Sequence, residues 1–374
     1  MENRSSIKTS FELLGLLEME GHTILYCVLS LVLFLTTIIF NSFIVYLVWT
    51  EERLHKPMYV LICNLLCNGI FGSCSFFPKL LMDLLTSSTT IARNGCLVQS
   101  LSINFFAFYE IFTFTLMVYD QNLAVCHPLK YVTLMTNQRA AQLLTILLVT
   151  SFAVTLGAFL LTLRVPLCGT QIMNIFCDNM SIFILACTDT FINNIYGWVS
   201  TVTVFLPSIT FIVFSYIRIY IICRKLSPDS SKKTMHIVVT HLINFSIFLI
   251  GVMFVFIRNR VGNLKLPVSG HILLSTPSLV LPPLLNPLVF GVRMKALKVK
   301  MIRLFRTNMG KDPEVIKGQE MPRTLTFLVI IQESPPAKWP SSRKSLKGSW
   351  HLMETSVDAK AIRPELVVKP HRTL

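Results

Sequence analysis

The chain has 374 residues, of which 53% are hydrophobic and only 14% are charged, and its mean hydropathy is +0.62. Soluble domains carry roughly 25% charged residues, so this composition indicates a membrane protein and excludes disorder over residues 22–306. The net charge of +15 does not indicate a nucleic-acid-binding protein, because the basic residues form no single patch or arm in the sequence.

Seven apolar segments are long enough to cross a hydrocarbon core, which takes about 20 helical residues. In chain order they cover 23–49, 58–84, 97–122, 140–163, 195–222, 235–257 and 268–291. The first is too long for a signal peptide and lacks a cleavage site of small residues. The sequence therefore predicts an all-α membrane protein, a bundle of seven transmembrane helices.

The basic residues predict the orientation of the bundle, since short loops rich in Lys and Arg stay on the inner side. They favour an extracellular N-terminus over residues 1–22, with Asn3 as a glycosylation acceptor in the triplet Asn3-Arg4-Ser5. Residues 23–306 form the transmembrane domain. It ends in a basic amphipathic helix over 292–306, although a simple stop-transfer flank fits the same residues. Residues 307–374 are expected to be a disordered cytoplasmic tail.

Four of the ten cysteines fall on the outer side in this topology, namely Cys96, Cys168, Cys177 and Cys187. An even set in an oxidising compartment suggests two disulfides. The four allow three pairings, and these residues alone do not choose among them. The other six cysteines lie within spans or at their inner ends, where we expect them to pack as small buried hydrophobic residues.

Several motifs, in order across residues 23–305, resemble those of vertebrate olfactory receptors. Among these receptors they resemble the fish-type members. They are 54–59 (LHKPMY), 117–131 (MVYDQNLAVCHPLKY), 176–178 (FCD), 185–190 (LACTDT), 233–242 (KTMHIVVTHL) and 282–290 (PPLLNPLVF). The resemblance implies a rhodopsin-like G-protein-coupled receptor in the plasma membrane of sensory neurons. Its implied partners are a small-molecule odorant, a stimulatory heterotrimeric G protein and the lipid bilayer. It also implies the disulfides Cys96–Cys177 and Cys168–Cys187.

Two motifs of the signalling machinery depart from the family pattern. Asp-Arg-Tyr is replaced by Asp120, Gln121 and Asn122, and Gln121 lacks the permanent multidonor cation of arginine. We expect both the resting lock and the contact with the G protein to be weakened. Asp120 would then pair with a basic residue of a nearby loop or rest in water.

The Asn-Pro-x-x-Tyr motif of the seventh helix ends here in phenylalanine. Phe290, after Asn286 and Pro287, keeps the ring of tyrosine but loses one hydrogen bond of about 1 kcal/mol. Tyr216 in the fifth helix completes the residues that the resemblance assigns to activation and coupling.

A third departure concerns the polar residues of the membrane midplane. An intramembrane carboxylate such as Glu110 is costly and therefore indicates function. In similar receptors this glutamate and an acid of helix 2 hold a sodium ion, but the helix 2 position here matches Gly69. We expect a weakened sodium site or a protonated Glu110, with Asn41 and Asn286 as hydrogen-bond partners.

The resemblance implies a ligand pocket between the outer halves of helices 3, 5, 6 and 7, under the second outer loop. Its candidates mix hydrogen-bonding and apolar side chains, although ordinary helix packing explains the apolar ones equally well. They are Ile103, Asn104, Ala107, Phe108, Asp178, Gly197, Ser200, Thr201, Val204, Val252, Phe256 and Arg260. Arg260 has two interpretations: a cation that holds a carboxylate ligand, or an interfacial arginine that snorkels to the membrane surface.

The sequence thus predicts an odorant receptor that is neither an enzyme nor dependent on a cofactor, since no catalytic or metal-binding spacing occurs. A second interpretation is a receptor-like protein that binds its ligand but couples poorly because of Gln121, Phe290 and Gly69. A transporter or channel is a remote third, because only Glu110 lies clearly deep in the bilayer among the charged residues.

Overall fold

A computed structural model of the chain describes residues 10–224, 228–258 and 267–293, and all of these belong to one structural unit. Several predictions fall on residues outside these ranges. They concern Asn3, Arg260, all but the first residues of the amphipathic helix over 292–306, and the tail over 307–374.

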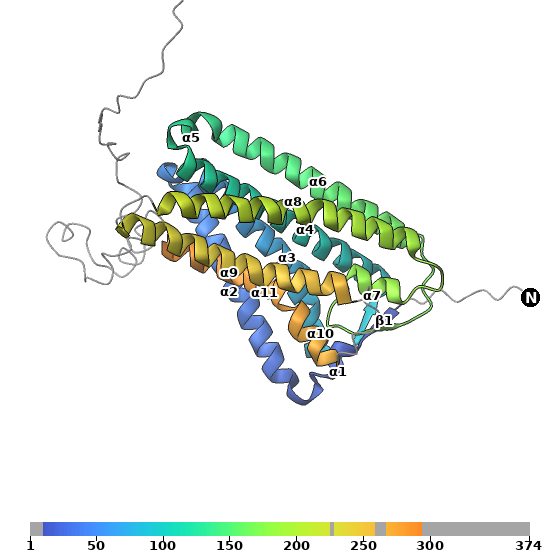
Figure 1. Cartoon of the computed structure of the whole chain (residues 1–374). Coiled ribbons are helices and arrows are strands. Elements are labelled where there is room, and N and C mark those ends of the chain that lie inside the picture. Colours follow the sequence, from blue (N-terminus) through green and yellow to red (C-terminus); the bar gives the residue numbers. More distant parts are fainter. Residues whose placement is uncertain (1–9, 225–227, 259–266, 294–374) are drawn as a thin grey trace, which may run out of the picture. The chain divides into compact units, whose positions relative to one another are not determined.

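Seven long helical segments run side by side in the described part of the chain (Figure 1). The first six are α2 (Thr23–Thr50), α3 (Pro57–Thr86), α4 (Arg93–Cys126), α6 (Asn137–Leu163), α8 (Phe191–Cys223) and α9 (Pro228–Arg258). The seventh is divided into α10 (Val268–Ser275) and α11 (Pro277–Arg293). Each predicted span overlaps one of these segments, so the predicted fold class is confirmed.

The helices have the length and the surface of membrane spans. Six described stretches are long and apolar enough to cross a bilayer: Glu20–Thr50, Pro57–Thr86, Arg93–Cys126, Asn137–Leu163, Phe191–Cys223 and Val268–Phe290. The apolar stretch Phe245–Ile257 belongs to the remaining helix, α9. Large apolar side chains such as Ile24, Val199 and Leu206 lie exposed on the outside of the bundle, where lipid replaces water as the solvent.

Local sequence explains where several helices begin and end. Pro57 and Pro128 occupy the first turns of α3 and of the short α5 (Pro128–Leu134), where the missing N–H costs nothing. The Thr136 hydroxyl caps α6 by accepting from the Arg139 N–H at 3.3 Å. Ser87 follows the last residue of α3 and has a positive φ of 50°. Its N–H donates to the Asp83 carbonyl and so closes the last turn of the helix.

The seventh segment is irregular because it is rich in proline. Pro282, Pro283 and Pro287 lie inside α11, and each lacks the N–H that would continue the helical ladder. The Asn41 amide donates to the freed Pro283 carbonyl at 2.8 Å, which ties α2 to α11. Neighbouring side chains satisfy such carbonyls in membrane helices, so these prolines are compatible with a span.

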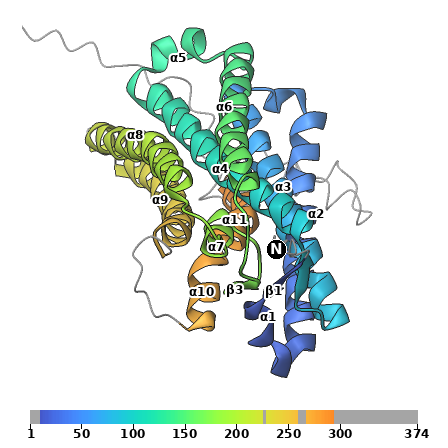
Figure 2. The same ribbon diagram turned by 90° about the vertical axis from the view of Figure 1, so that its right-hand side faces the viewer.

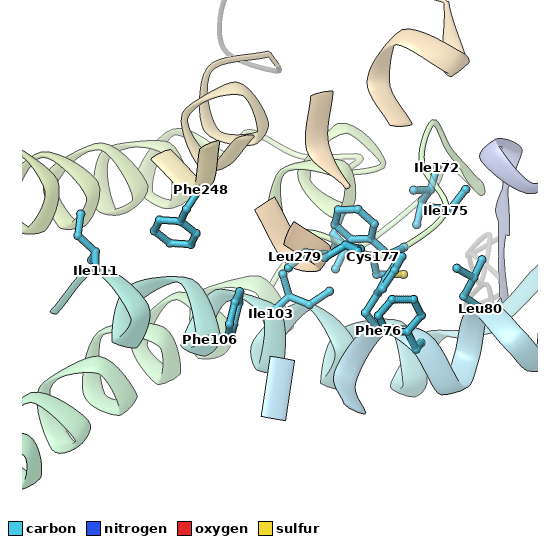
Figure 3. Close-up of a cluster of buried hydrophobic side chains, with 14 of the residues drawn as sticks. Phe76, Leu80, Ile103, Phe106, Ile111, Ile172, Ile175, Cys177, Phe248 and Leu279 are labelled. Carbon is cyan, nitrogen blue, oxygen red and sulfur yellow. The ribbon is translucent and has the colours of Figure 1, made fainter. Parts of the chain in front are cut away.

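The buried core runs along the bundle and reaches the loop between α6 and α8. Figure 3 shows Phe248 of α9 facing Phe106 of α4, and their ring centroids are 6.4 Å apart at right angles. Nearer the loop, Phe76 and Phe176 form a second edge-to-face pair at 5.7 Å. Such pairs add about 0.5–1.5 kcal/mol to the burial of the rings, and here they join α3, α4, α9 and the loop.

The cysteines outside the disulfides do not all pack as expected. All six are free thiols, but Cys67 and Cys74 lie exposed on the outside of the bundle and only Cys223 is fully buried. Our prediction was therefore wrong for Cys67 and Cys74. Their apolar character suits a lipid-facing surface as well as a core, so hydropathy alone does not distinguish the two locations.

A small sheet that the sequence did not reveal covers one end of the bundle. Its strands are β1 (Ser10–Leu13), β2 (Thr90–Ala92) and β3 (Gln171–Ile172), in the order β2-β1-β3. β1 pairs antiparallel with β2 and parallel with β3. Figure 2 shows β1, β3, the short helix α1 (Leu14–Leu17), α7 (Asn179–Ile184) and α10 gathered at the end opposite α5.

Side chains and an ion pair fasten this sheet to the bundle. Phe11 and Leu13 are at most 1% exposed, so β1 is held as part of the core. Lys79 of α3 donates to the Thr90 carbonyl at 2.9 Å and also pairs with the buried Asp83. β1 is therefore fastened to the bundle as part of the folded unit.

Gly15 provides a test of this packing. A Cβ at Gly15 would lie 2.6 Å from the Asn174 carbonyl carbon and 2.8 Å from the Ile175 nitrogen, whereas a Cβ at Gly21 would meet nothing within 4 Å. We expect Gly15→Ala to destabilise the protein by about 1–3 kcal/mol and to lower its melting temperature in detergent. Gly21→Ala is the matched control, and equal melting temperatures for both variants would contradict the packing of α1 against the loop.

Candidate functional site

Two disulfides shape the loop between α6 and α8. One joins Cys96, in the first turn of α4, to Cys177, with the Cα atoms 5.3 Å apart. The other joins Cys168 to Cys187 within the loop, with a Cα separation of 5.4 Å. These are the pairs that the resemblance implies. The first anchors the loop over α4, and the second closes a smaller ring beside it.

Hydrogen bonds hold the anchored loop in one conformation. The Cys177 N–H donates to the Gln99 carboxamide oxygen at 2.9 Å. The buried Asp178 carboxylate caps α7 by accepting from the N–H and the hydroxyl of Ser181. Asn174 donates to the Ser275 hydroxyl at 3.3 Å. The loop is thereby connected to α4 and to α10 and can act as a fixed roof over the space between the helices.

A cavity of about 90 Å³ lies beneath this roof. Helices α4, α6, α8, α9 and α11 and the loop itself supply its walls, which are mostly apolar. For scale, an apolar cavity of roughly 150 Å³ holds benzene, so this smaller space suits a ligand of only a few carbon atoms. The lining residues are Ile103, Asn104, Phe106, Ala107, Phe108, Thr155, Ala158, Phe176, Asp178, Asn179, Met180, Gly197, Ser200, Thr201, Phe205, Val252, Val255, Phe256, Ser278 and Leu279.

Most of the predicted pocket residues meet in this one cavity. Of the twelve, ten are in the lining, Val204 is not, and Arg260 lies outside the described residues. Val204 is buried elsewhere in the core, and Phe205 takes its place on the cavity wall. The helical period does not distinguish the two residues, because Val204 lies four residues after Ser200 and Phe205 four residues after Thr201, and Ser200 and Thr201 both line the cavity.

The sequence reasoning missed other lining residues for a different reason. Thr155 and Ala158 come from α6, and Ser278 and Leu279 come from α11. Neither pair was near a motif that pointed to ligand binding. Phe176 could have been predicted, because it directly precedes Cys177 and the disulfide fixes the position of that part of the loop.

The midplane carboxylate Glu110 is buried and accepts two amide hydrogen bonds. Asn68 of α3 donates to Oε2 at 2.7 Å, and Asn286 of α11 donates to Oε1 at 3.4 Å. The Asn286 contact was predicted, but the stronger partner Asn68 was not. Asn41 donates to the Thr37 and Pro283 carbonyls instead of Glu110, so its predicted pairing with Glu110 was wrong.

Gly69 faces the seventh helix directly. A Cβ on Gly69 would lie 3.3 Å from the Cα of Pro283 and 3.2 Å from its Cβ. Any side chain here would push α3 and α11 apart by a few tenths of an ångström. Gly69 thus brings these two helices together, while Asn68 beside it supplies the polar group that meets Glu110.

At the opposite end of the bundle Asp120 is only 2% exposed, so it does not rest in water. Its carboxylate accepts a hydrogen bond of 2.9 Å from the Tyr131 hydroxyl of α5, and it makes no ion pair within the described part of the chain. Burial, and after it the Asp120 carboxylate, raises the pKa of the Tyr131 phenol. Tyr131 therefore stays protonated and is the partner of Asp120, in place of the basic residue we had expected.

The residues next to Asp120 have unequal hydrogen bonding. Asn122 donates to the Ser215 carbonyl at 3.3 Å, which ties α4 to α8. The side-chain oxygen of Gln121 and the Tyr216 hydroxyl are buried and have no hydrogen-bond partner among the residues that the structure describes. Phe290 is buried in a cluster of apolar side chains that includes Leu47 of α2 and Leu61 of α3. The phenylalanine thus serves packing, while Gln121 and Tyr216 are left as an acceptor and a donor in need of partners.

These features define a membrane receptor with seven helices, a disulfide-anchored loop and a cavity beneath that loop. Residues 26–308 match the olfactory receptor family, and the chain belongs to that family. It is 32% identical to human olfactory receptor 52P1 over 276 residues, which are 73% of this chain and 86% of that receptor. Over 304 residues it is 30% identical to rat olfactory receptor 1496, covering 81% of this chain and 97% of the relative.

The bond between Asn68 and Glu110 can be tested with a double-mutant cycle. We expect Asn68→Leu to destabilise the protein by about 1–3 kcal/mol, because it leaves a buried carboxyl with one long hydrogen bond. In a Glu110→Leu background the same change should cost less, since the group it served is gone. Thermal unfolding of the four proteins in detergent measures the difference. Equal costs in both backgrounds would show that Asn68 does not act through Glu110.

Proposed function

We propose that this chain is an odorant receptor that binds a small-molecule odorant in the cavity and activates a stimulatory heterotrimeric G protein. The observation that carries the proposal is the cavity beneath the disulfide-anchored loop, into which ten predicted pocket residues converge. Membership of the olfactory receptor family supports it. The mostly apolar walls fit a ligand that reaches the protein from air or lipid.

The proposal includes an orientation in the plasma membrane. Disulfides form and persist on the oxidising side of a membrane. The end that holds Cys168–Cys187 and Cys96–Cys177 is therefore assigned to the outside, together with the N-terminal strand β1. The end that holds Asp120 then faces the cytoplasm and the G protein. The excess of basic residues in the flanks of that end agrees with this assignment.

Filling the cavity tests the binding site. Ala107→Phe adds a ring inside the lining, so we expect the response to any activating odorant to fall by about 10-fold or more. Val202→Phe is the control, because Val202 is 45% exposed on the outer side of α8. Cyclic AMP in cells that express equal surface amounts of each protein is the measurement. An unchanged dose–response curve for Ala107→Phe would place the ligand elsewhere.

Restoring the family residue at position 121 tests the coupling. We expect the native chain to raise cyclic AMP with an odorant, and Gln121→Arg to raise it further. Arginine brings a permanent cation with five donors to the inner end. Adding Phe290→Tyr to Gln121→Arg should raise the cyclic AMP response a little further. The added hydroxyl can stabilise the signalling state by one hydrogen bond, which is worth about 1 kcal/mol or less.

The pattern of responses separates the proposal from weak coupling. Signalling by the native chain at equal surface expression supports a working receptor. A silent native chain beside two signalling variants would contradict it, and would show a protein that binds its ligand but couples poorly.

A further inference from the structure

The polar groups that line the cavity are not equally free to bind a ligand. Asn104 of α4 uses its amide N–H to donate to the Ser100 carbonyl at 2.9 Å. That bond fixes the orientation of the carboxamide. If the group were turned over, its Oδ1 would lie against the Ser100 carbonyl oxygen, and two acceptors cannot form a hydrogen bond. The carbonyl oxygen Oδ1 has no hydrogen-bond partner among the described residues and is not sealed in the core. Asn104 thus offers the cavity an acceptor.

Three hydroxyls in the lining have already used their proton. Ser200 donates to the Gly197 carbonyl at 3.2 Å, Thr155 donates to the Ser151 carbonyl at 2.8 Å, and Ser278 donates to the Ser275 carbonyl at 2.7 Å. A hydroxyl has one proton and two lone pairs. What remains of each toward the cavity is an acceptor, as with Asn104.

Donors are scarcer in this lining. The Thr201 hydroxyl of α8 makes no hydrogen bond with any described residue, so its proton is available. Asn179 accepts from the Thr162 hydroxyl at 2.9 Å, which leaves its amide N–H beside the loop. The cavity therefore presents more acceptors than donors. A ligand with a donor of its own matches it better than a ligand that can only accept.

The geometry points to a small aliphatic alcohol as the preferred ligand class, with Asn104 as the residue that determines the specificity. The ligand hydroxyl donates to Asn104 Oδ1 and accepts from Thr201. This inference rests on the proposed function and adds the chemical class of the odorant. A ketone or an ether accepts from Thr201 but leaves Asn104 Oδ1 desolvated and unpaired, which costs affinity.

The rest of the lining argues against a charged ligand with the same donors. Phe108 and Phe205 form an edge-to-face pair at 6.0 Å, and Phe256 packs at right angles against Trp198 at 5.1 Å. These rings supply apolar wall. The carboxylate in the lining, Asp178, already accepts from the N–H and the hydroxyl of Ser181 at the start of α7. Transfer of an ammonium group into such surroundings is far more costly than transfer of a hydroxyl. The aromatic walls suit the compact carbon body of a neutral alcohol.

Matched odorants test the inference in the cyclic AMP assay. The probes are 2-propanol, acetone, methoxyethane and 2-aminopropane, with 1-propanol, propanal, methoxyethane and 1-aminopropane as a second set. We expect the alcohol in each set to act at a concentration about 10-fold lower than its carbonyl, ether and amine partners, which corresponds to one hydrogen bond. Equal potencies, or a carbonyl, ether or amine that acts more strongly, would overturn the inference.

Two variants assign the preference to residues. Asn104→Leu should weaken the response to alcohols about 10-fold and leave the response to ketones and ethers in place, which also shows that the variant folds. Thr201→Val should weaken alcohols and ketones together. The controls are Asn94→Leu and Thr203→Val, since Asn94 and Thr203 lie exposed on the same two helices. Unchanged alcohol selectivity in Asn104→Leu would overturn the role of Asn104.

The same assay separates this inference from the proposed function. Responses to the panel without a preference for alcohols would leave the receptor function intact and refute the ligand class. The proposed function itself would be refuted by a different result. In that case neither the native protein nor Gln121→Arg would raise cyclic AMP with these probes or with a broad odorant panel, at normal surface expression.

Discussion

The disulfide between Cys96 and Cys177 is the constraint on which the outer half of the molecule depends. It places the loop over the first turn of α4, and every other feature of this end meets the loop. β3 of the loop pairs with β1, Asn174 of the loop bonds to Ser275, and Asp178 caps α7 at the cavity. A cross-link between residues 81 apart removes much freedom from the unfolded chain.

Within the bundle, polar side chains hold the helices together where the solvent is lipid. The carboxyl of Glu110 joins α4 to Asn68 of α3 and Asn286 of α11, and Asn41 joins α2 to α11 at Pro283. Each bond satisfies a group that no solvent could reach. The same bonds set the distance between these helices, together with the missing side chain of Gly69. A polar cluster thus takes the part that apolar packing plays in a soluble core.

The seven spans could be predicted from the sequence because each is a long apolar run, and burial in lipid demands little else. The sheet could not, because β3 has two residues and β1 pairs with it in parallel across 160 residues of chain. The resemblance to olfactory receptors gave the location of the pocket, and counting along the helices then placed ten of its residues in the cavity lining, whereas Val204 lies outside that lining. Asn68 was missed because the resemblance to the family pointed to Gly69, and only packing shows which of the two neighbours faces Glu110.

The two ends of the bundle satisfy their polar groups in different ways. Beneath the loop, most hydroxyls are bonded to their own helices, and the free groups open into a cavity. At the Asp120 end, the Gln121 side-chain oxygen and the hydroxyls of Ser215 and Tyr216 are buried without partners in the described part of the chain, close to the Asn122–Ser215 bond. An unpaired buried group costs about 1–3 kcal/mol. A rearrangement of α8 against α4 that let Tyr216 donate to Gln121 would recover part of that cost.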